Sequence, residues 1–146
     1  MALLDTDDTV TADEPVLVLI EPHMLQAGWP HIGPMLEQAC ADSRGQFNVA
    51  TILANLENWP ILGIVKGGKL QAVMVTCIVQ LEGRRVLDCL LATGDQAKQW
   101  PAVDDAFDDF ARQFGCSSVR IPCARKGWAK ALPHWRIVGY VMEREI

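Results

Sequence analysis

The chain has 146 residues, of which half are apolar and about a fifth are charged, so it suits one globular domain and is too apolar for a disordered protein. The formal net charge of −5 is concentrated before residue 15, where five acidic residues stand without a base: Asp5, Asp7, Asp8, Asp13 and Glu14. The remaining chain is electroneutral, which argues against general nucleic-acid binding. No apolar run approaches the roughly 20 residues that span a bilayer, and no secretory leader is present, so we expect a cytoplasmic protein without membrane contact.

Two regions are expected from this charge distribution. Residues 1–14 predict an acidic, flexible tail, which is either a mobile terminus or a docking segment for a basic partner, and residues 15–146 predict a single domain. The five cysteines, an odd number without a C-x-x-C pair, indicate a reducing compartment and neither a disulfide framework nor a zinc site. The three histidines have no acidic or thiol partner at ligand spacing, so we expect no metal.

The first half predicts one strand and two helices. Residues 15–20 form a continuous apolar run, typical of a strand buried on both faces. Residues 24–40 have helical apolar spacing, and the helix is expected to begin near Pro30 or Pro34 because proline is tolerated in a first turn. A second helix over residues 49–56 is expected to end before Pro60.

The middle of the chain predicts an antiparallel meander. Residues 61–65, 70–81 and 86–92 read as strands joined by short turns. The first turn contains Gly67 and Gly68, which suit the positive φ angles of a tight hairpin.

The last third predicts a loop, two helices and two strands. Residues 93–100 are a polar loop, and Pro101 opens a strongly amphipathic helix that ends before Gly115. A short strand over residues 118–122, a helix over 126–132 and a final strand over 135–142 follow. The expected order is therefore β-α-α-β-β-β-α-β-α-β, an α+β fold.

This order resembles the GNAT superfamily of acyl-CoA-dependent N-acyltransferases over nearly all of residues 16–146. The best local match is AVDDAFDDFARQFGC, residues 102–116, which is similar to a central family helix that commonly ends in Ala-x-x-x-Gly-Cys. The resemblance implies a mixed, mainly antiparallel central sheet flanked by helices.

The resemblance also implies an acetyl-CoA loop of the form [Q/R]-x-x-G-x-[G/A] just before this helix. The matching positions hold Asp95, Lys98 and Trp100, and Pro101 follows. Glycines let backbone amides approach the pyrophosphate, whereas tryptophan is an obstacle and proline lacks an N–H donor. We interpret the acetyl-CoA site as degenerate. If acetyl-CoA does bind, the expected contacts are Thr93, Gly94, Asp95, Gln96 and Lys98.

Catalytic candidates are few. Asp88 stands on the strand where the family often supplies a general base, and the alternative is a solvent-facing carboxylate or one paired with Arg84 or Arg85. Cys89 is expected to be a buried thiol and not a nucleophile. Tyr140, the only tyrosine, falls in the predicted final strand and not near the last helix, where the family often places its acid.

Three tryptophans, Trp100, Trp128 and Trp135, are candidates for contact with a protein partner. Residues 125–132, RKGWAKAL, with the Trp-containing segment after them, resemble GNAT-like proteins of tailed bacteriophages. Many of those lack the CoA loop and act as virion, assembly or host-interaction proteins.

Two functions follow. The first is a non-catalytic protein-binding, structural or assembly module without a cofactor, located in a bacterial host's cytoplasm or in a virion, with a protein partner or with other copies of itself. The alternative is a divergent acetyl-CoA-dependent N-acyltransferase.

Overall fold

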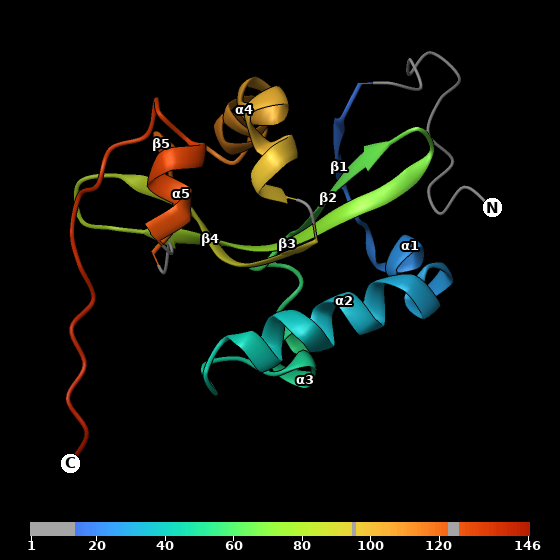
Figure 1. The fold of residues 1–146 in the computed structure, drawn as a ribbon, viewed down its shortest axis with the longest axis horizontal. Helices are drawn as coiled ribbons and strands as arrows, with labels where there is room; N and C mark the ends of the chain where they lie inside the picture. Colours follow the sequence, from blue (N-terminus) through green and yellow to red (C-terminus); the bar gives the residue numbers. More distant parts are fainter. Residues whose placement is uncertain (1–13, 95, 123–125) are drawn as a thin grey trace.

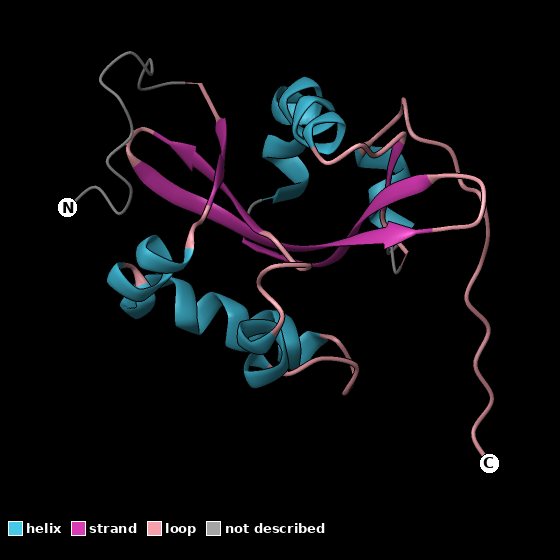
Figure 2. Cartoon of the chain, turned by 180° about the vertical axis from the view of Figure 1, so that it is seen from behind, coloured by secondary structure: helices cyan, strands magenta, loops and turns pink. Residues whose placement is uncertain are grey.

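The computed structural model describes residues 14–94, 96–122 and 126–146, which form a twisted sheet with helices on both faces (Figures 1 and 2). The predicted tail, apart from Glu14, lies outside these residues. In chain order the elements are β1 (Val16–Leu19), α1 (Pro22–Ala27), α2 (Trp29–Asp42), α3 (Val49–Ala54), β2 (Ile61–Lys66), β3 (Lys69–Gln80), β4 (Arg85–Gly94), α4 (Gln96–Gln113), β5 (Ser118–Arg120) and α5 (Lys126–Ala131). The predicted α+β class is confirmed.

The sheet has the order β1-β2-β3-β4-β5 in the described part of the chain. Strands β1 to β4 pair antiparallel, and β5 joins β4 in parallel after the crossover through α4. The β2–β3 hairpin turns at Gly67 and Gly68, whose φ angles of 61° and 74° confirm the predicted turn. The mainly antiparallel sheet is therefore confirmed.

Half-way along strand β4, its ladder with β3 is interrupted by a bulge and its pairing with β5 ends. Its ladder with β3 shifts where Thr76 pairs with Cys89 and Val75 pairs with Leu91, so Leu90 is an extra residue in a β-bulge. On the other edge, β5 pairs only with Val86, Leu87 and Asp88. The structure describes no strand beside β4 from Cys89 onward, so that part of the edge is open to other groups.

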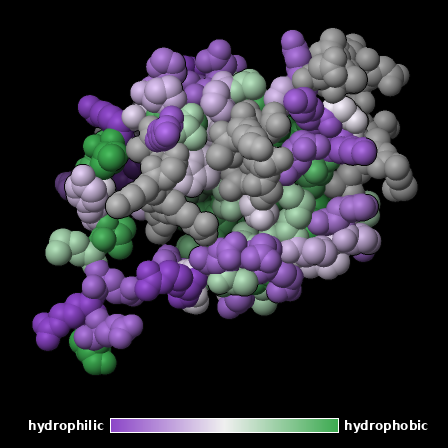
Figure 3. Space-filling view, viewed as in Figure 1, coloured by the Kyte–Doolittle hydropathy of each residue, from purple (hydrophilic) through white to green (hydrophobic). Residues whose placement is uncertain are grey.

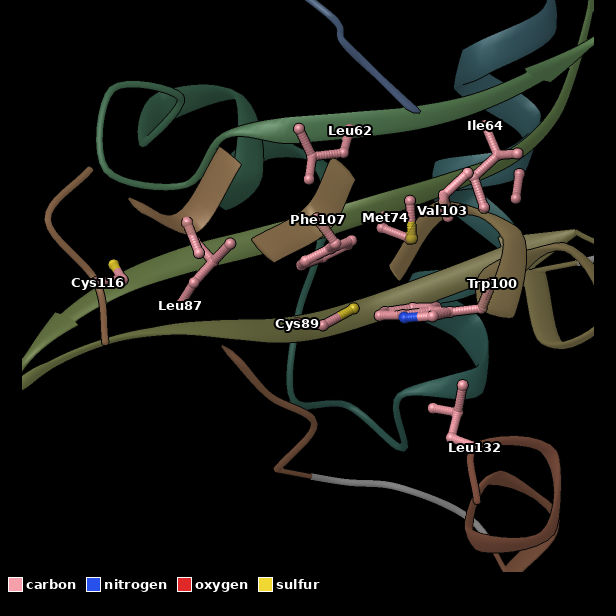
Figure 4. Packing of buried hydrophobic residues seen from close by; sticks show 12 residues of the cluster. Leu62, Ile64, Met74, Leu87, Cys89, Trp100, Val103, Phe107, Cys116 and Leu132 are labelled. Atoms are coloured by element: carbon pink, nitrogen blue, oxygen red, sulfur yellow. The ribbon is translucent and has the colours of Figure 1, made fainter. Parts of the chain in front are cut away.

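Two hydrophobic clusters hold the layers together. Helices α1, α2 and α3 cover one face, while α4 and α5 cover the other (Figures 1 and 2). Beneath α4, the side chains of Val103, Phe107 and Ala111 are buried against Leu62, Ile64, Met74, Leu87 and Cys89 of the sheet (Figure 4). Gly115 ends this helix with a φ of 74°, as its sequence predicts.

The first half departs from prediction at its helices and at β1. An additional helix, α1, begins at Pro22, and α2 begins at Trp29, with Pro30 in its first turn and Pro34 inside it. Gly28, whose carbonyl accepts from Ile32 N–H at 3.0 Å, separates the two helices. Strand β1 lies at the sheet edge and is half-buried, so the prediction of burial on both faces is wrong.

The predicted final strand is also wrong. Residues 135–146 have no regular secondary structure and leave the body of the protein as an extended segment (Figure 1). Their sequence has strand character, but a strand forms only where a neighbouring edge accepts its backbone hydrogen bonds. In a single chain this segment has no such neighbour among the described residues.

Candidate functional site

The candidate site is the region where β4 separates from β5, below the first turns of α4 and beside α5. We call it the β4–α4 site, and it comprises residues 88–94, 96–104, Trp128, Leu132 and Trp135. Leu132 belongs to the same buried cluster as Cys89 and Trp100 (Figure 4). The site therefore joins the open edge of β4 to the beginning of the helix that follows it.

The predicted polar loop over residues 93–100 is wrong. Strand β4 continues to Gly94, where it pairs with Ala72, and half-buried Thr93 pairs with Val73. Helix α4 already begins at Gln96, so Lys98 stands in its first turn, and Asp95 lies outside the described residues. Only position 95 separates the end of β4 from the start of α4.

The earlier helix start also changes the role of Pro101. Only the first four N–H groups of a helix lack partners within it, and Pro101 is the sixth residue of α4. The expectation that Pro101 removes a donor from the helix start is therefore wrong, because its position interrupts a bond inside the helix instead.

Trp100, a predicted candidate for contact with a protein partner, is fully buried in the single chain. Its ring stacks on Phe107, with centroids 4.9 Å apart, and meets Trp128 and Trp135 edge-on at 5.3 and 5.8 Å. Trp100, Val103 and Phe107 stand at i, i+3 and i+7, on the apolar face of α4. Trp128 and Trp135 are half-buried against the same cluster, so all three indoles close the space between α4 and α5.

Asp104 lies beside this aromatic group, four residues after Trp100. Its Oδ1 and the Trp100 Nε1 are buried without a hydrogen-bond partner of regular geometry. Desolvation raises the pKa of Asp104 above its ordinary value of 3.8, and the charges of Asp108 and Asp105 act in the same direction. The indole N–H groups of Trp135 and Trp100 partly oppose this rise in pKa. The ionised carboxylate is therefore poorly solvated.

We expect Asp104→Asn to unfold at a higher temperature than the wild type at neutral pH. A raised folded-state pKa means that the folded protein binds more protons than the unfolded chain just above pH 3.8, so stability falls as the pH rises through that window. Asparagine removes the charge and keeps an oxygen acceptor. Thermal unfolding measured from pH 3 to 7 should show that the difference in melting temperature between the variant and the wild type becomes smaller as the pH falls.

Asp105→Asn is the matched control, because it removes the same charge from an exposed neighbour. An equal change of melting temperature in both variants would show that overall charge, and not the desolvated Asp104 carboxylate, is responsible.

Asp88 is buried and is held by Arg120. The Arg120 Nε donates to Asp88 Oδ1 at 2.7 Å, and Nη2 donates to Oδ2 at 2.8 Å. The pair is formed by adjacent residues of the parallel β4–β5 ladder, and the hydrogen bond to Asp88 raises the pKa of Arg120. The predictions of a solvent-facing Asp88 or of pairing with Arg84 or Arg85 are wrong. Each carboxylate oxygen of Asp88 therefore accepts one hydrogen bond from the Arg120 guanidinium group.

The other reactive side chains considered from the sequence are Cys89 and Tyr140. Cys89 is buried as predicted, and burial together with the Asp88 charge raises the pKa of its thiol to about 12. Tyr140 is 87% exposed in the extended C-terminal segment. Cys40, Cys77, Cys89 and Cys116 are free thiols, and no group of metal-binding side chains occurs within the described ranges.

Three features of the site bear on acyl-CoA binding. The strand-to-helix connection is one residue long, Trp100 fills the core, and Asp88 is paired. Two shallow cavities of about 430 and 360 Å³ lie elsewhere: one is lined by α1, α2 and Leu53, the other by the end of α4 and residues 116–119. Neither is lined by a residue of β4. In the described part of the chain, no helix is long and apolar enough to cross a membrane.

Sequence comparison finds no matching family model and no matching curated protein. Solved structures do match. A GNAT family acetyltransferase from Staphylococcus aureus subsp. aureus USA300_TCH1516 aligns with a TM-score of 0.58 and 9% identity, over 91% of this chain and 99% of that one. A putative acetyl transferase from Pyrococcus furiosus aligns with a TM-score of 0.58 and 11% identity, over 91% of this chain and 100% of that one. An aminoglycoside acetyltransferase from an uncultured soil metagenomic sample aligns with a TM-score of 0.58 and 8% identity, over 91% of this chain and 97% of that one.

These alignments confirm the predicted GNAT fold. The alignments cover 91% of this chain and nearly all of the similar chains. Identities of 8–11% establish the fold alone, and the fold does not establish the chemistry.

Proposed function

We propose that this chain is a non-catalytic module on a GNAT fold that acts through protein contacts, as a structural, assembly or host-interaction protein. Residues 125–132, which resemble GNAT-like proteins of tailed bacteriophages, support a virion or host-cytoplasm setting.

The observation that carries this proposal is the indole group between α4 and α5. A cofactor running from the open edge of β4 to the start of α4 would pass the space that Trp100, Trp128 and Trp135 share. Trp100 is part of the hydrophobic core and cannot move aside without exposing that core. The Asp88–Arg120 pair supports the same conclusion, since it removes the best candidate for a general base.

A divergent acyl-CoA-dependent N-acyltransferase is the second candidate, and the comparisons favour it because these similar structures are described as acetyltransferases. Two features of β4 also support it. Its edge is open from Cys89 onward, and the bulge at Leu90 leaves a peptide group outside the ladder, a feature common near active sites. A backbone N–H beside a bulge is a suitable donor for an acyl oxygen.

Calorimetric titration with acetyl-CoA separates the two candidates. We expect no saturable heat with the wild-type protein, because the indole group fills the approach to the helix. The same titration of Trp128→Ala, with Trp135→Ala as the matched indole control, tests whether removing one half-buried ring opens the approach. Circular dichroism confirms that each protein is folded.

Saturable binding by the wild type at or below about 100 µM, roughly −5.5 kcal/mol, would overturn the non-catalytic proposal. The next step would then be a screen of amine acceptors, with Asp88→Asn as the test of the general base.

A further inference from the structure

A shallow apolar hollow lies in the layer of helices α1, α2 and α3, on the face of the sheet opposite α4. Its volume is about 430 Å³, and it is lined by Pro22, Leu25, Gln26, Trp29 and Leu53. Leu25 is buried, Trp29 is half-buried, and Leu53 is 39% exposed. Apart from Gln26 these side chains are apolar, so the hollow presents a hydrophobic surface to solvent. A concave surface of this kind is typical of a binding site.

A glycine fixes the indole that forms one wall of the hollow. A Cβ atom at Gly33 would lie 2.8 Å from Cε2 and 2.9 Å from Nε1 of Trp29, which is closer than Cβ contacts in proteins. Only glycine therefore lets the ring lie against α2 one turn after Trp29. Glycine inside a helix is unfavourable for the backbone, and here it gives the indole its position. An indole held in place binds a partner with little loss of side-chain entropy.

The helical layer around the hollow is acidic. Between residues 20 and 60 the acidic and basic residues are four acids and one base: Glu21, Glu37, Asp42, Glu57 and Arg44. Arg44 lies 3.8 Å from Glu143, so its charge is already opposed. Glu21 directly precedes Pro22, and Glu57 follows Leu53 by four residues. Hydrophilic side chains cover much of this layer, below the sheet in Figure 3. Such a surface attracts a basic partner and repels an acidic one.

We propose that the hollow beside Trp29 is a docking site for a protein partner, and that it takes an apolar side chain of a segment that also carries arginine or lysine. The apolar side chain fills the space between Trp29 and Leu53. The basic side chain faces the acidic rim, and an arginine also stacks favourably on an indole. The inference rests on the proposed function, because it names the surface and the partner chemistry of the same protein-binding module.

The test uses the full chain and a displayed library of random peptides as the probe. We expect the selected peptides to share an aromatic or aliphatic residue next to arginine or lysine. The affinity of one such peptide is then measured by fluorescence anisotropy. Binding should weaken as the salt concentration rises, because the rim charges are exposed to solvent.

Two substitutions test the hollow itself. Leu53→Asp places a charge in its wall and should weaken peptide binding by about tenfold. Leu53→Met is its matched control, because it keeps an apolar side chain of similar size. Gly33→Ala should also weaken binding, since the added methyl group displaces the indole. Trp59→Ala is the indole control, because this half-buried ring lies in the same layer, against Phe47 and outside the hollow.

The acidic rim is tested by the double variant Glu21→Gln, Glu57→Gln. We expect weaker binding of the same peptide and a smaller dependence on salt, because two attractive charges are lost. Circular dichroism confirms that each variant is folded.

A library that yields no binding peptide would overturn this inference. Peptides that lack a basic residue, or whose binding survives both Leu53→Asp and Gly33→Ala, would overturn it as well. A wild-type dimer in light scattering that Leu53→Asp dissociates would assign the hollow to a second copy instead. Saturable acetyl-CoA binding overturns the proposed function, whereas absence of a docking peptide without acetyl-CoA binding overturns the docking site alone.

Discussion

Replacing Trp100 by alanine is expected to lower the free energy of unfolding by about 3–5 kcal/mol. The indole is fully buried between α4 and the sheet, stacks on Phe107 and meets two further indoles edge-on. Its removal leaves a cavity that α4 cannot close, because this helix also packs through Val103 and Phe107. Urea unfolding followed by circular dichroism measures the loss as a lower midpoint at an unchanged slope.

Trp135→Ala is the matched comparison, because it removes the same side chain from a half-buried position in the same cluster. We expect a clearly smaller loss. If Trp100→Ala costs less than about 1 kcal/mol, the ordinary range for a surface change or a mild core change, then Trp100 is not a core residue and the filled site must be reconsidered.

The fold was largely predictable because its strongest signals are local. The apolar face of residues 102–114, the Gly67–Gly68 turn and the strands of the meander each depend on neighbours a few residues away. The observed bounds of α4, β2, β3 and β4 differ from the predicted ones mainly at the ends of each element. Hydrophobic periodicity and turn chemistry are therefore sufficient for this part of the chain.

The errors at the predicted loop over residues 93–100 and at Pro101 arise from one misplaced helix start. With the helix beginning at Pro101, Trp100 lies in the predicted loop and outside the helix. With α4 beginning at Gln96, Trp100 and Asp104 are four residues apart in one helix and share a face. That spacing was present in the sequence, but the preference of proline for a first turn outweighed it.

Two other features depend on contacts between distant parts of the chain. Arg120 reaches Asp88 only because β5 lies parallel to β4, and the two residues are 32 positions apart. The C-terminal segment has the composition of a strand, but strand formation depends on which edge is open nearby. Neither the ion pair nor the absent strand follows from local pattern, so both required the structure.

Arg120→Ala is expected to lower the free energy of unfolding by about 3 kcal/mol. The Asp88 side chain is only 8% exposed, so loss of its two hydrogen bonds leaves a buried charge without compensation. Asp88→Asn should cost less, because the Arg120 side chain is 30% exposed and water can solvate its guanidinium group. Urea unfolding at neutral pH, extended to the double variant, should show a double loss well below the sum of the single losses.

This asymmetry also tests the function assigned to Asp88. A carboxylate kept free for proton transfer would tolerate loss of Arg120 with little change in stability, and Asp88→Asn would then affect catalysis more than folding. If the carboxylate instead holds β5 against β4, loss of Arg120 would clearly lower stability, and Asp88→Asn would affect folding more than catalysis. If the double variant instead lost as much free energy of unfolding as the two single variants together, the pair would not be coupled. Asp88 would then return as a candidate base beside the open edge of β4.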